Sequence, residues 1–345
     1  MVTIAVDAMG GDDAPDALVR GVALVSLDER PLSTILVGDA PELTRRLREV
    51  RHNPERIAVH HAPESIAMNE AAGDALRRKP RASVVVCAHL VREGAADAMV
   101  TAGHTGAAVL AAARHFRRLP GVRRAALAAV YPTELRRGDK EDPFSLILDV
   151  GATLDATAED LVSFAAMGSS YAQVVSNNPR PRVALLSSGA ESTKGPPEIV
   201  RAHALLNALP GIHFIGNVEG TGIPRGAADV VVCSGFLGNV VLKMLEGVGE
   251  TILGLARYAG KERLLWRAGL WALASGLDRV KTLTDWQEYG GAPILGLGHV
   301  CIKAHGRSGP RAVANAVKVA AKAAAGGVPA KIAASLAQAD TLQNC

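Results

Sequence analysis

Residues 2–15 read Val2-Thr-Ile-Ala-Val-Asp-Ala-Met-Gly-Gly-Asp-Asp-Ala-Pro15. In this stretch a short apolar run passes directly into a glycine-rich polar turn. Glycine allows tight turns and proline suits the first turn of a helix, so the stretch predicts a strand, a loop and a helix, with Asp13 as the N-cap. The pattern recurs five times, and the further strands are expected at residues 98–101, 144–148, 183–186, 213–215 and 230–232.

Continuous apolar strands that alternate with helices indicate parallel strands covered on both faces. We therefore predict an α/β fold, a three-layer α/β/α sandwich with a mostly parallel sheet. Ligands bind beyond the carboxyl ends of strands in such sheets, so the six turns are expected to converge on one site. No linker marks a boundary, and residues 1–345 are expected to form a single domain, with two lobes around a cleft as the other arrangement. Residues 81–92 are predicted to be helical rather than extended.

The composition argues against a nucleic-acid partner. The formal charge is only +4, and aromatic residues make up 3% of the chain, which leaves little for base stacking. The four cysteines lack a CxxC pair and are expected to be reduced, buried thiols. No basic leader and no apolar run of about 18 residues is present, so we expect a cytoplasmic protein.

Basic residues gather in three short segments, which are either solvated faces or a landing surface for an acidic partner protein. They are Arg45, Arg46, Arg48 and Arg51; Arg77, Arg78, Lys79 and Arg81; and Arg117, Arg118, Arg123 and Arg124.

Residues 258–281 are predicted to form an amphipathic helical arm. Leu270, Leu273 and Leu277 share a helical face, and the charge-free run around them is too short to span a bilayer. Two placements stay open: a helical hairpin packed in a dimer or in the core, and an arm that lies on a membrane surface.

Glycine loops between a strand and a helix let backbone N–H groups approach an anion, so phosphate is the expected ligand. The chain has neither a GxGxxG sequence after its first strand nor a P-loop, which disfavours dinucleotide and nucleotide triphosphate binding. Lys194 follows a strand end, where its ammonium group can hold an oxyanion, although an exposed loop lysine without function is the alternative. Asn239 opens a helix and is either an amide donor to a substrate oxygen or an N-cap.

The sequence offers no nucleophile and no metal site. There is no GxSxG motif and no cysteine with an evident His or Asn partner, Cys233 being the one thiol at a strand end. The histidines and the Asp12-Asp13 pair lack a metal-binding spacing, so we predict no metal and no cofactor.

Seven motifs, in this order along nearly the whole chain, resemble the phosphate acyltransferase (PlsX) family of bacterial phospholipid synthesis. They are Asp7-Ala-Met-Gly-Gly-Asp-Asp-Ala-Pro15, Thr101-Ala-Gly-His-Thr-Gly-Ala107, Asp149-Val-Gly-Ala152, Gly189-Ala-Glu-Ser-Thr-Lys-Gly195, Gly216-Asn-Val-Glu-Gly220, Gly235-Phe-Leu-Gly-Asn-Val-Val-Leu-Lys243 and Glu288-Tyr-Gly-Gly-Ala-Pro-Ile-Leu-Gly296. The resemblance implies transfer of a long acyl chain from acyl carrier protein to inorganic phosphate. It also implies a homodimer with a core like those of phosphotransacetylases and isocitrate-dehydrogenase-like enzymes, and membrane contact through residues 258–281.

The resemblance further implies roles for individual residues. Phosphate already carries negative charge, so the enzyme mainly positions it and neutralises charge. Lys194 would bind phosphate or the developing oxyanion, Asn239 would polarise the thioester carbonyl, and His104 would protonate the leaving thiolate. The phosphate cradle would comprise Asp7, Gly10, Gly11, Gly103, Thr105 and Gly106, and the substrate-binding residues would be Glu191, Asn217, Glu219 and Gly238.

Four positions depart from the family pattern. His104 and Thr153 stand where asparagine is expected and can still form hydrogen bonds, whereas Gly222 and Ser234 stand where aspartate is expected and remove carboxylates. Three alternatives stay open: a phosphotransacetylase-like enzyme that uses acyl-CoA, which shares the fold and the chemistry; a noncatalytic phosphate- or lipid-binding protein, favoured if the four departures disable the site; and, less favoured, a decarboxylating dehydrogenase.

Overall fold

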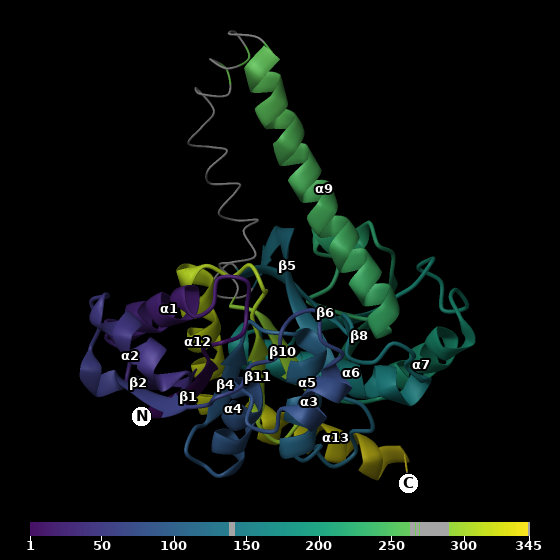
Figure 1. Cartoon of the computed structure of the whole chain (residues 1–345). Coiled ribbons are helices and arrows are strands. Elements are labelled where there is room, and N and C mark those ends of the chain that lie inside the picture. Colours follow the sequence, from purple (N-terminus) through teal and green to yellow (C-terminus); the bar gives the residue numbers. More distant parts are fainter. Residues whose placement is uncertain (138–141, 263–265, 267–268, 270–289, 344–345) are drawn as a thin grey trace.

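The computed structural model describes residues 1–137, 142–262, 266, 269 and 290–343 (Figure 1). Its strands form an 11-stranded sheet in the order β3-β2-β1-β4-β11-β10-β5-β6-β9-β7-β8. The strands are β1 (Val2–Asp7), β2 (Leu32–Gly38), β3 (Ile57–His61), β4 (Ala98–Thr101), β5 (Ala126–Arg137), β6 (Asp142–Leu148), β7 (Arg182–Leu186), β8 (His213–Val218), β9 (Val230–Val232), β10 (Ala292–Leu295) and β11 (Val300–Lys303).

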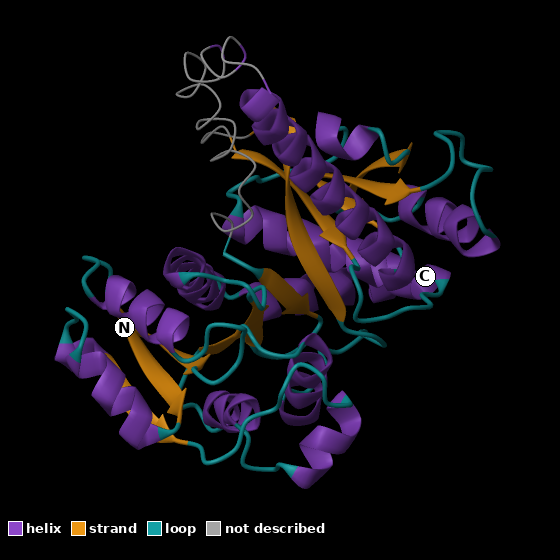
Figure 2. Cartoon of the chain, turned by 45° about the horizontal axis from the view of Figure 1, so that its top comes forward, coloured by secondary structure: helices purple, strands orange, loops and turns teal. Residues whose placement is uncertain are grey.

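The described helices are α1 (Asp16–Ser26), α2 (Ala40–Arg48), α3 (Ala72–Arg78), α4 (Ser83–Arg92), α5 (Thr105–His115), α6 (Ala158–Val175), α7 (Pro197–Asn207), α8 (Gly222–Arg225), α9 (Gly235–Glu262), α12 (Pro310–Ala325) and α13 (Val328–Gln343), with a 3-10 helix at Pro54–Arg56. Figure 2 shows helices on both sides of the strands, which confirms the predicted α/β/α layers. Side chains alternate between the two cores: Ile4 and Val6 of β1 enter one, and Ala5 enters the other.

The six predicted strands are all present, but they do not all run in the same direction. Strand β10 pairs antiparallel with β11 and β5, and β5 pairs antiparallel with β6, while the other pairings in the described residues are parallel. Hence β1 and β4 run opposite to β6, β7, β8 and β9. The antiparallel strands therefore divide the six turns into two groups at opposite edges of the sheet, and their convergence on one site stays a prediction.

Among the predictions about single segments and residues, some are confirmed and one is wrong. Residues 81–92 do contain a helix, and helix α7 begins at Pro197. The prediction that Asp13 is an N-cap is wrong: α1 starts after Pro15, which occupies the cap position, and no side chain caps it. Three cysteines are buried free thiols, as predicted, and Cys345 lies outside the described residues. The choice between one domain and two lobes stays a prediction.

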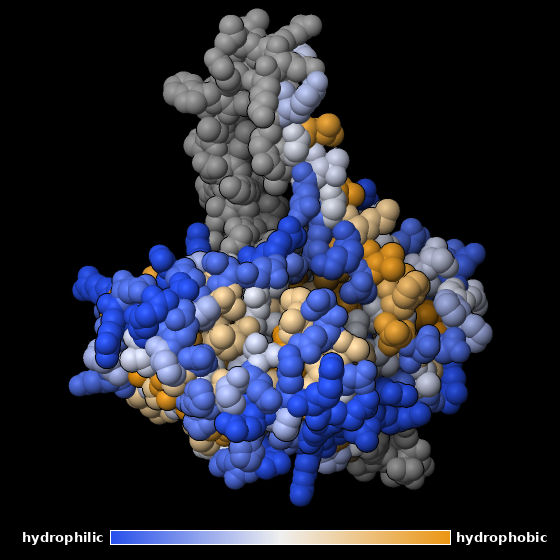
Figure 3. Space-filling model, in the orientation of Figure 1, coloured by the Kyte–Doolittle hydropathy of each residue, from blue (hydrophilic) through white to orange (hydrophobic). Residues whose placement is uncertain are grey.

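Helix α9 projects away from the body of the molecule (Figure 1). One of its faces carries large apolar side chains, each 47–69% exposed, and Figure 3 shows hydrophobic residues along the helix. We call this set the α9 stripe; it comprises Phe236, Val240, Met244, Val248, Ile252, Leu255 and Tyr258. Most of the predicted arm, residues 258–281, lies outside the described residues. Within the described ranges, no helix has both the length and the hydropathy of a membrane span.

Candidate active site

The carboxyl ends of β1, β4 and β11 carry a row of three polar residues. Asp7 is in register with Thr101, and Thr101 is in register with Lys303. All three are buried, with exposures of 2%, 0% and 7%. The Thr101 hydroxyl donates to Asp7 Oδ2 at 2.7 Å and accepts from the Gly103 N–H at 3.0 Å, so it ties the loop after β4 to strand β1.

Asp7 organises the loop that follows β1. Its Oδ1 accepts from the Met9 N–H at 3.3 Å. Burial raises the pKa of Asp7, and hydrogen bonds from Ser83 and Thr101 offset this only in part. An ionised carboxylate cannot donate a hydrogen bond to phosphate, so Asp7 would contribute to the predicted cradle by shaping the loop.

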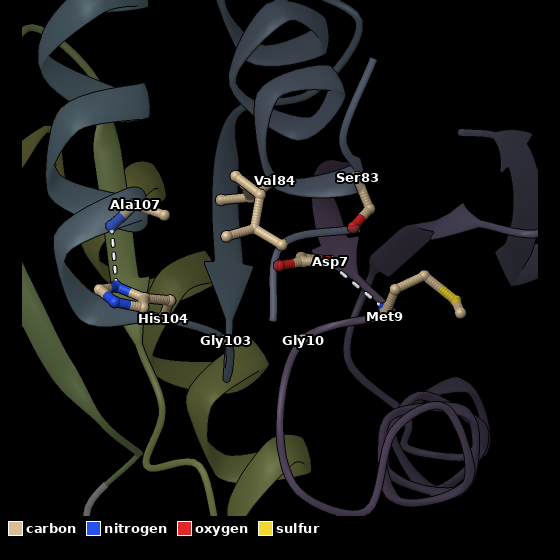
Figure 4. Close-up of a pocket in the computed structure, with 9 residues that line it drawn as sticks. Asp7, Met9, Gly10, Ser83, Val84, Gly103, His104 and Ala107 are labelled. Carbon is tan, nitrogen blue, oxygen red and sulfur yellow. Dashed lines mark hydrogen bonds between the residues drawn. The ribbon is translucent and has the colours of Figure 1, made fainter. Parts of the chain in front are cut away.

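Four of the predicted site residues line one small pocket. Asp7, Gly10, Gly103 and His104 lie there beside Ser83, and Figure 4 shows them at the strand ends. The loops after β1 and β4 are in contact, since a Cβ on Gly10 would lie 2.7 Å from the Gly103 nitrogen. Glycine is required at this contact.

Backbone donors lie on the loops after β1 and β4, next to the residues that line this pocket. The Gly103 N–H donates to Thr101 Oγ1. By contrast, the N–H groups of Gly10, Gly11, Thr105 and Gly106 have no acceptor in the described part of the chain. Unpaired amides at the start of a helix favour an anion. This arrangement can hold phosphate.

His104 caps helix α5. Its Nδ1 accepts from the Ala107 N–H at 3.3 Å (Figure 4). With Nδ1 as acceptor, the ring carries its proton on Nε2 and can donate a hydrogen bond, but releasing that proton would leave an imidazolate. To give a proton to a thiolate and return to a neutral ring, His104 would have to carry a hydrogen on Nδ1 as well, which would break the cap; its predicted proton transfer stays a prediction.

The second group of loops is built around Asp149, at the end of β6. This residue is 0% exposed, and its carboxylate accepts from the N–H groups of Leu127, Gly151, Ala152 and Thr153 at 2.5–3.0 Å. Burial raises the pKa of Asp149, and these four backbone donors oppose the effect. Asp149 fixes the path of the loop.

Helix α9 begins against this loop. The helix starts at Gly235, so Asn239 lies inside it and is not its N-cap. Asn239 Nδ2 donates to the Val150 carbonyl at 3.0 Å. A Cβ on Gly238 would lie 1.9 Å from the Asp149 carbonyl oxygen, so only glycine lets the helix approach this closely. Gly238, predicted to contact substrate, thus packs against the loop.

The turns after β7 and β8 hold Lys194. The Ser187 hydroxyl donates to the Lys194 carbonyl at 2.9 Å, and Asn217 Nδ2 donates to the Glu191 carbonyl at 2.8 Å. Lys194 is exposed, and its ammonium group has no partner among the described residues. Asn217 is 7% exposed and its Oδ1 also lacks a described partner. Hydrogen bonds therefore hold the backbone of this loop, while the Lys194 ammonium group stays available to a ligand. Glu219 is exposed, and its carbonyl accepts from the Gly222 N–H.

Helix α9 links the two groups of loops. Lys243 lies one turn beyond Asn239, and its charge helps to lower the pKa values of Lys303 and His305, although burial is the larger cause in both. Farther along, Glu250 accepts from Arg307 at 3.4 Å.

Sequence reasoning missed two buried polar residues of these loops. Asp149 lay within a motif but was not assigned a role, and Lys303 was not singled out. The sequence signal for Lys303 was a lysine that ends an apolar run before a glycine-containing loop. The described residues contain no group of side chains that would hold a metal ion.

Comparison with known proteins decides the family. Residues 2–331 match the family model described as "Fatty acid synthesis protein". The "Phosphate acyltransferase" of Desulfitobacterium hafniense (strain Y51) is 43% identical over 321 residues, which is 93% of each chain. That of Myxococcus xanthus is 42% identical over 338 residues, covering 97% of this chain and 94% of the relative.

This chain belongs to the phosphate acyltransferase family. It is an enzyme, and membership in the phosphate acyltransferase family supports acyl transfer to phosphate. Among solved structures, a phosphotransacetylase from Streptococcus pyogenes has a TM-score of 0.62 at 18% identity over 93% of both chains. EutD phosphotransacetylase from Staphylococcus aureus has a TM-score of 0.61 at 16% identity over 94% of both chains. These two likenesses confirm the predicted fold.

Proposed function

We propose that the enzyme transfers a long-chain fatty acyl group from the thioester of acyl carrier protein to inorganic phosphate, and that the acyl phosphate serves phospholipid synthesis. The observation that carries the phosphate half of this proposal is the set of four unpaired amides at Gly10, Gly11, Thr105 and Gly106. The proposal that an acyl group is transferred to this phosphate rests on membership in the phosphate acyltransferase family.

The proposed chemistry needs no protein nucleophile. A phosphate oxygen attacks the thioester carbonyl carbon, a C–O bond forms, and the carbonyl oxygen becomes an oxyanion. Collapse of this intermediate breaks the C–S bond, and the sulfur leaves as a thiolate that takes its proton from water. Lys194 neutralises the phosphate or the oxyanion, and Asn239 donates to the carbonyl oxygen with the amide hydrogen that Val150 does not use. Glu191, Asn217 and Glu219 shape the donor side of the site.

We expect His104 to act as a cap and hydrogen-bond donor, so His104→Asn should keep Tm and leave kcat within a few-fold. An asparagine amide can accept the Ala107 N–H as the imidazole does, and can donate as well. His104→Ala should lower the free energy of unfolding by about 0.5–2 kcal/mol. Thermal unfolding and steady-state assays of both variants check this. A large loss of kcat in a normally stable His104→Asn variant would restore proton transfer as its role.

The donor is proposed to be an acidic carrier protein. Arg45, Arg46, Arg77, Arg78 and Lys79 are engaged in ion pairs with neighbouring carboxylates. The third basic segment differs from these two in its ion pairs. Its four arginines are exposed and form no ion pair within the described ranges; they are Arg117, Arg118, Arg123 and Arg124. The Ala125 carbonyl beside them accepts from the Thr153 hydroxyl. A basic patch beside the Asp149 loop suits an acidic protein. The phosphates of acyl-CoA would also be attracted, so acyl-CoA remains the second candidate donor.

The decisive experiment compares donors. Wild-type enzyme is incubated with palmitoyl-carrier thioester or palmitoyl-CoA, with and without phosphate, and acyl phosphate is trapped with hydroxylamine. We expect phosphate-dependent product from the carrier-bound donor. Product from palmitoyl-CoA alone would favour the phosphotransacetylase-like alternative. Binding of phosphate without product from either donor would contradict the proposal and favour a binding protein.

We further propose that the enzyme is a cytoplasmic homodimer that also contacts the inner face of the membrane. The α9 stripe supports a dimer, because a monomer would leave its seven large apolar side chains in water. Membrane contact through residues 258–281 rests on their sequence and on the family resemblance.

A further inference from the structure

Lys303 is a buried ammonium group that no carboxylate pairs with. It is 7% exposed, and its Nζ donates to the carbonyls of Ala102, at 3.3 Å, and Ala304. No carboxylate of the described residues lies within ion-pair distance, and the third N–H has no described acceptor. Burying an unpaired charge is costly, so an isolated cation in this position calls for an anionic ligand.

Three loops meet around this ammonium group. The Asp12 N–H donates to the Gly306 carbonyl at 2.9 Å, and a Cβ on Gly11 would lie 3.2 Å from the Ala102 side chain. The loop after β1 therefore touches both the loop after β4 and the loop after β11. Lys303 donates to carbonyls of the last two, and the loop that carries Gly10 and Gly11 touches both of them.

The loop after β11 has the same form as the six glycine turns. It runs from Ala304 through Gly306 to Gly309, and helix α12 follows. Ser308 on this loop is 3% exposed, and its hydroxyl has no partner in the described part of the chain. A buried, unpaired hydroxyl beside a helix start is a second group that a ligand oxygen would satisfy.

The charges near Lys303 do not replace a ligand. Asp7 and Asp12 favour the charged lysine, and Lys243 of α9 disfavours it. The Asp7 carboxylate already accepts from Thr101 and Met9. Burial dominates and lowers the pKa of Lys303 to about 8.

We propose that Lys303 and the loop 304–309 bind a phosphate group and so complete the site that the amides of Gly10 and Gly11 begin. Two sources share this chemistry: inorganic phosphate, and the phosphodiester of the donor's pantetheine arm. The inference rests on the proposed function for its substrates. Binding of inorganic phosphate can be measured without turnover.

The test uses Lys303→Met, which keeps the length and apolar stem of the side chain but removes its charge. The readouts are the rise of Tm with added inorganic phosphate and the KM values for phosphate and for each donor. We expect the phosphate KM to rise about 10- to 100-fold, as for loss of one charged hydrogen bond, and the phosphate-dependent rise of Tm to disappear. Lys318→Met is the matched control. It removes a lysine of α12 that pairs with Asp28 at 3.0 Å and is not part of the loop 304–309, so it should leave both readouts unchanged.

The remaining outcomes separate the sources. A higher KM for carrier-bound and CoA donors, but not for a phosphate-free pantetheine thioester, would support the donor phosphodiester. Unchanged KM values together with an intact phosphate-dependent rise of Tm would overturn the proposal. If wild-type enzyme forms no product, the proposed function fails, and the phosphate-dependent Tm of wild type and Lys303→Met still decides the role of Lys303.

Lys303→Arg is a second test of the proposal, for the case that Lys303→Met does not fold. Phosphate binding by wild type should weaken as the pH rises through about 8, because Lys303 loses its proton there. Arginine stays charged, so the variant should lose this pH dependence. The other groups that bear on Lys303 are Asp7, Asp12, Cys301, Lys243 and His305, and burial raises the pKa of Cys301 to about 12. A pH dependence that persists in Lys303→Arg would contradict the assignment.

Discussion

Replacing Lys194 by alanine is expected to lower kcat for acyl phosphate formation about 10²-fold or more, comparable to loss of one oxyanion-hole donor. The ammonium group of Lys194 is exposed and unpaired in the described structure, so its removal breaks no hydrogen bond or ion pair. The bonds that hold the loop use the backbone carbonyls of Lys194 and Glu191, and both survive in the variant. The variant should therefore unfold at the wild-type Tm.

The measurement is kcat at saturating phosphate and donor, with acyl phosphate trapped by hydroxylamine. Lys331→Ala removes an exposed lysine from α13 and should have wild-type kcat. A variant with raised phosphate KM but normal kcat would show that Lys194 binds substrate and transition state equally. Near wild-type values of both constants would remove Lys194 from the mechanism.

A negative charge in the α9 stripe is expected to separate the proposed dimer, and Val248→Glu should raise its dissociation constant about 10³-fold or more. Val248 is 51% exposed and lies in the middle of the stripe. Each copy of a symmetric dimer carries the substitution, so two unpaired carboxylates would be buried. Sedimentation velocity over a range of protein concentrations measures the effect.

Glu250→Gln is the control, because this residue lies on the opposite side of α9 and faces Arg307. It should leave the dissociation constant unchanged. If Val248→Glu remains dimeric but no longer co-sediments with anionic lipid vesicles, the stripe is a membrane surface and the dimer forms elsewhere. A variant that matches wild type in both assays would leave the stripe without either role.

The layers of the fold were predictable because strands buried on both faces need continuous apolar sequence. The run Val2–Asp7 shows this, with Ile4 and Ala5 in opposite cores. Strand direction was not predictable. It depends on which distant strands pair, and the antiparallel partners of β10 lie at Ala126–Arg137 and Val300–Lys303, far apart in the sequence.

The part of the candidate site that is built from glycine-rich turns was predictable from the sequence. Gly10, Gly103 and His104 do meet in one pocket, as the glycine turns indicated. Lys303 has only a weak signal, a lysine that ends an apolar run, since the fold alone makes that lysine both buried and unpaired. The proton transfer from His104 stays a prediction, and the hydrogen bond from Ala107 that opposes it belongs to the folded helix start, which the sequence alone does not show.

The placement of β10 and β11 has a consequence for synthesis of the chain on the ribosome. These two strands lie between β4 and β5 and join the two halves of the sheet, although only α12 and α13 follow them in the sequence. Each half can pair its own strands early, but the halves cannot join until residues 292–303 have left the exit tunnel. Until then β4 and β5 present unpaired edges, so a nascent or truncated chain is exposed to aggregation at the centre of its own sheet.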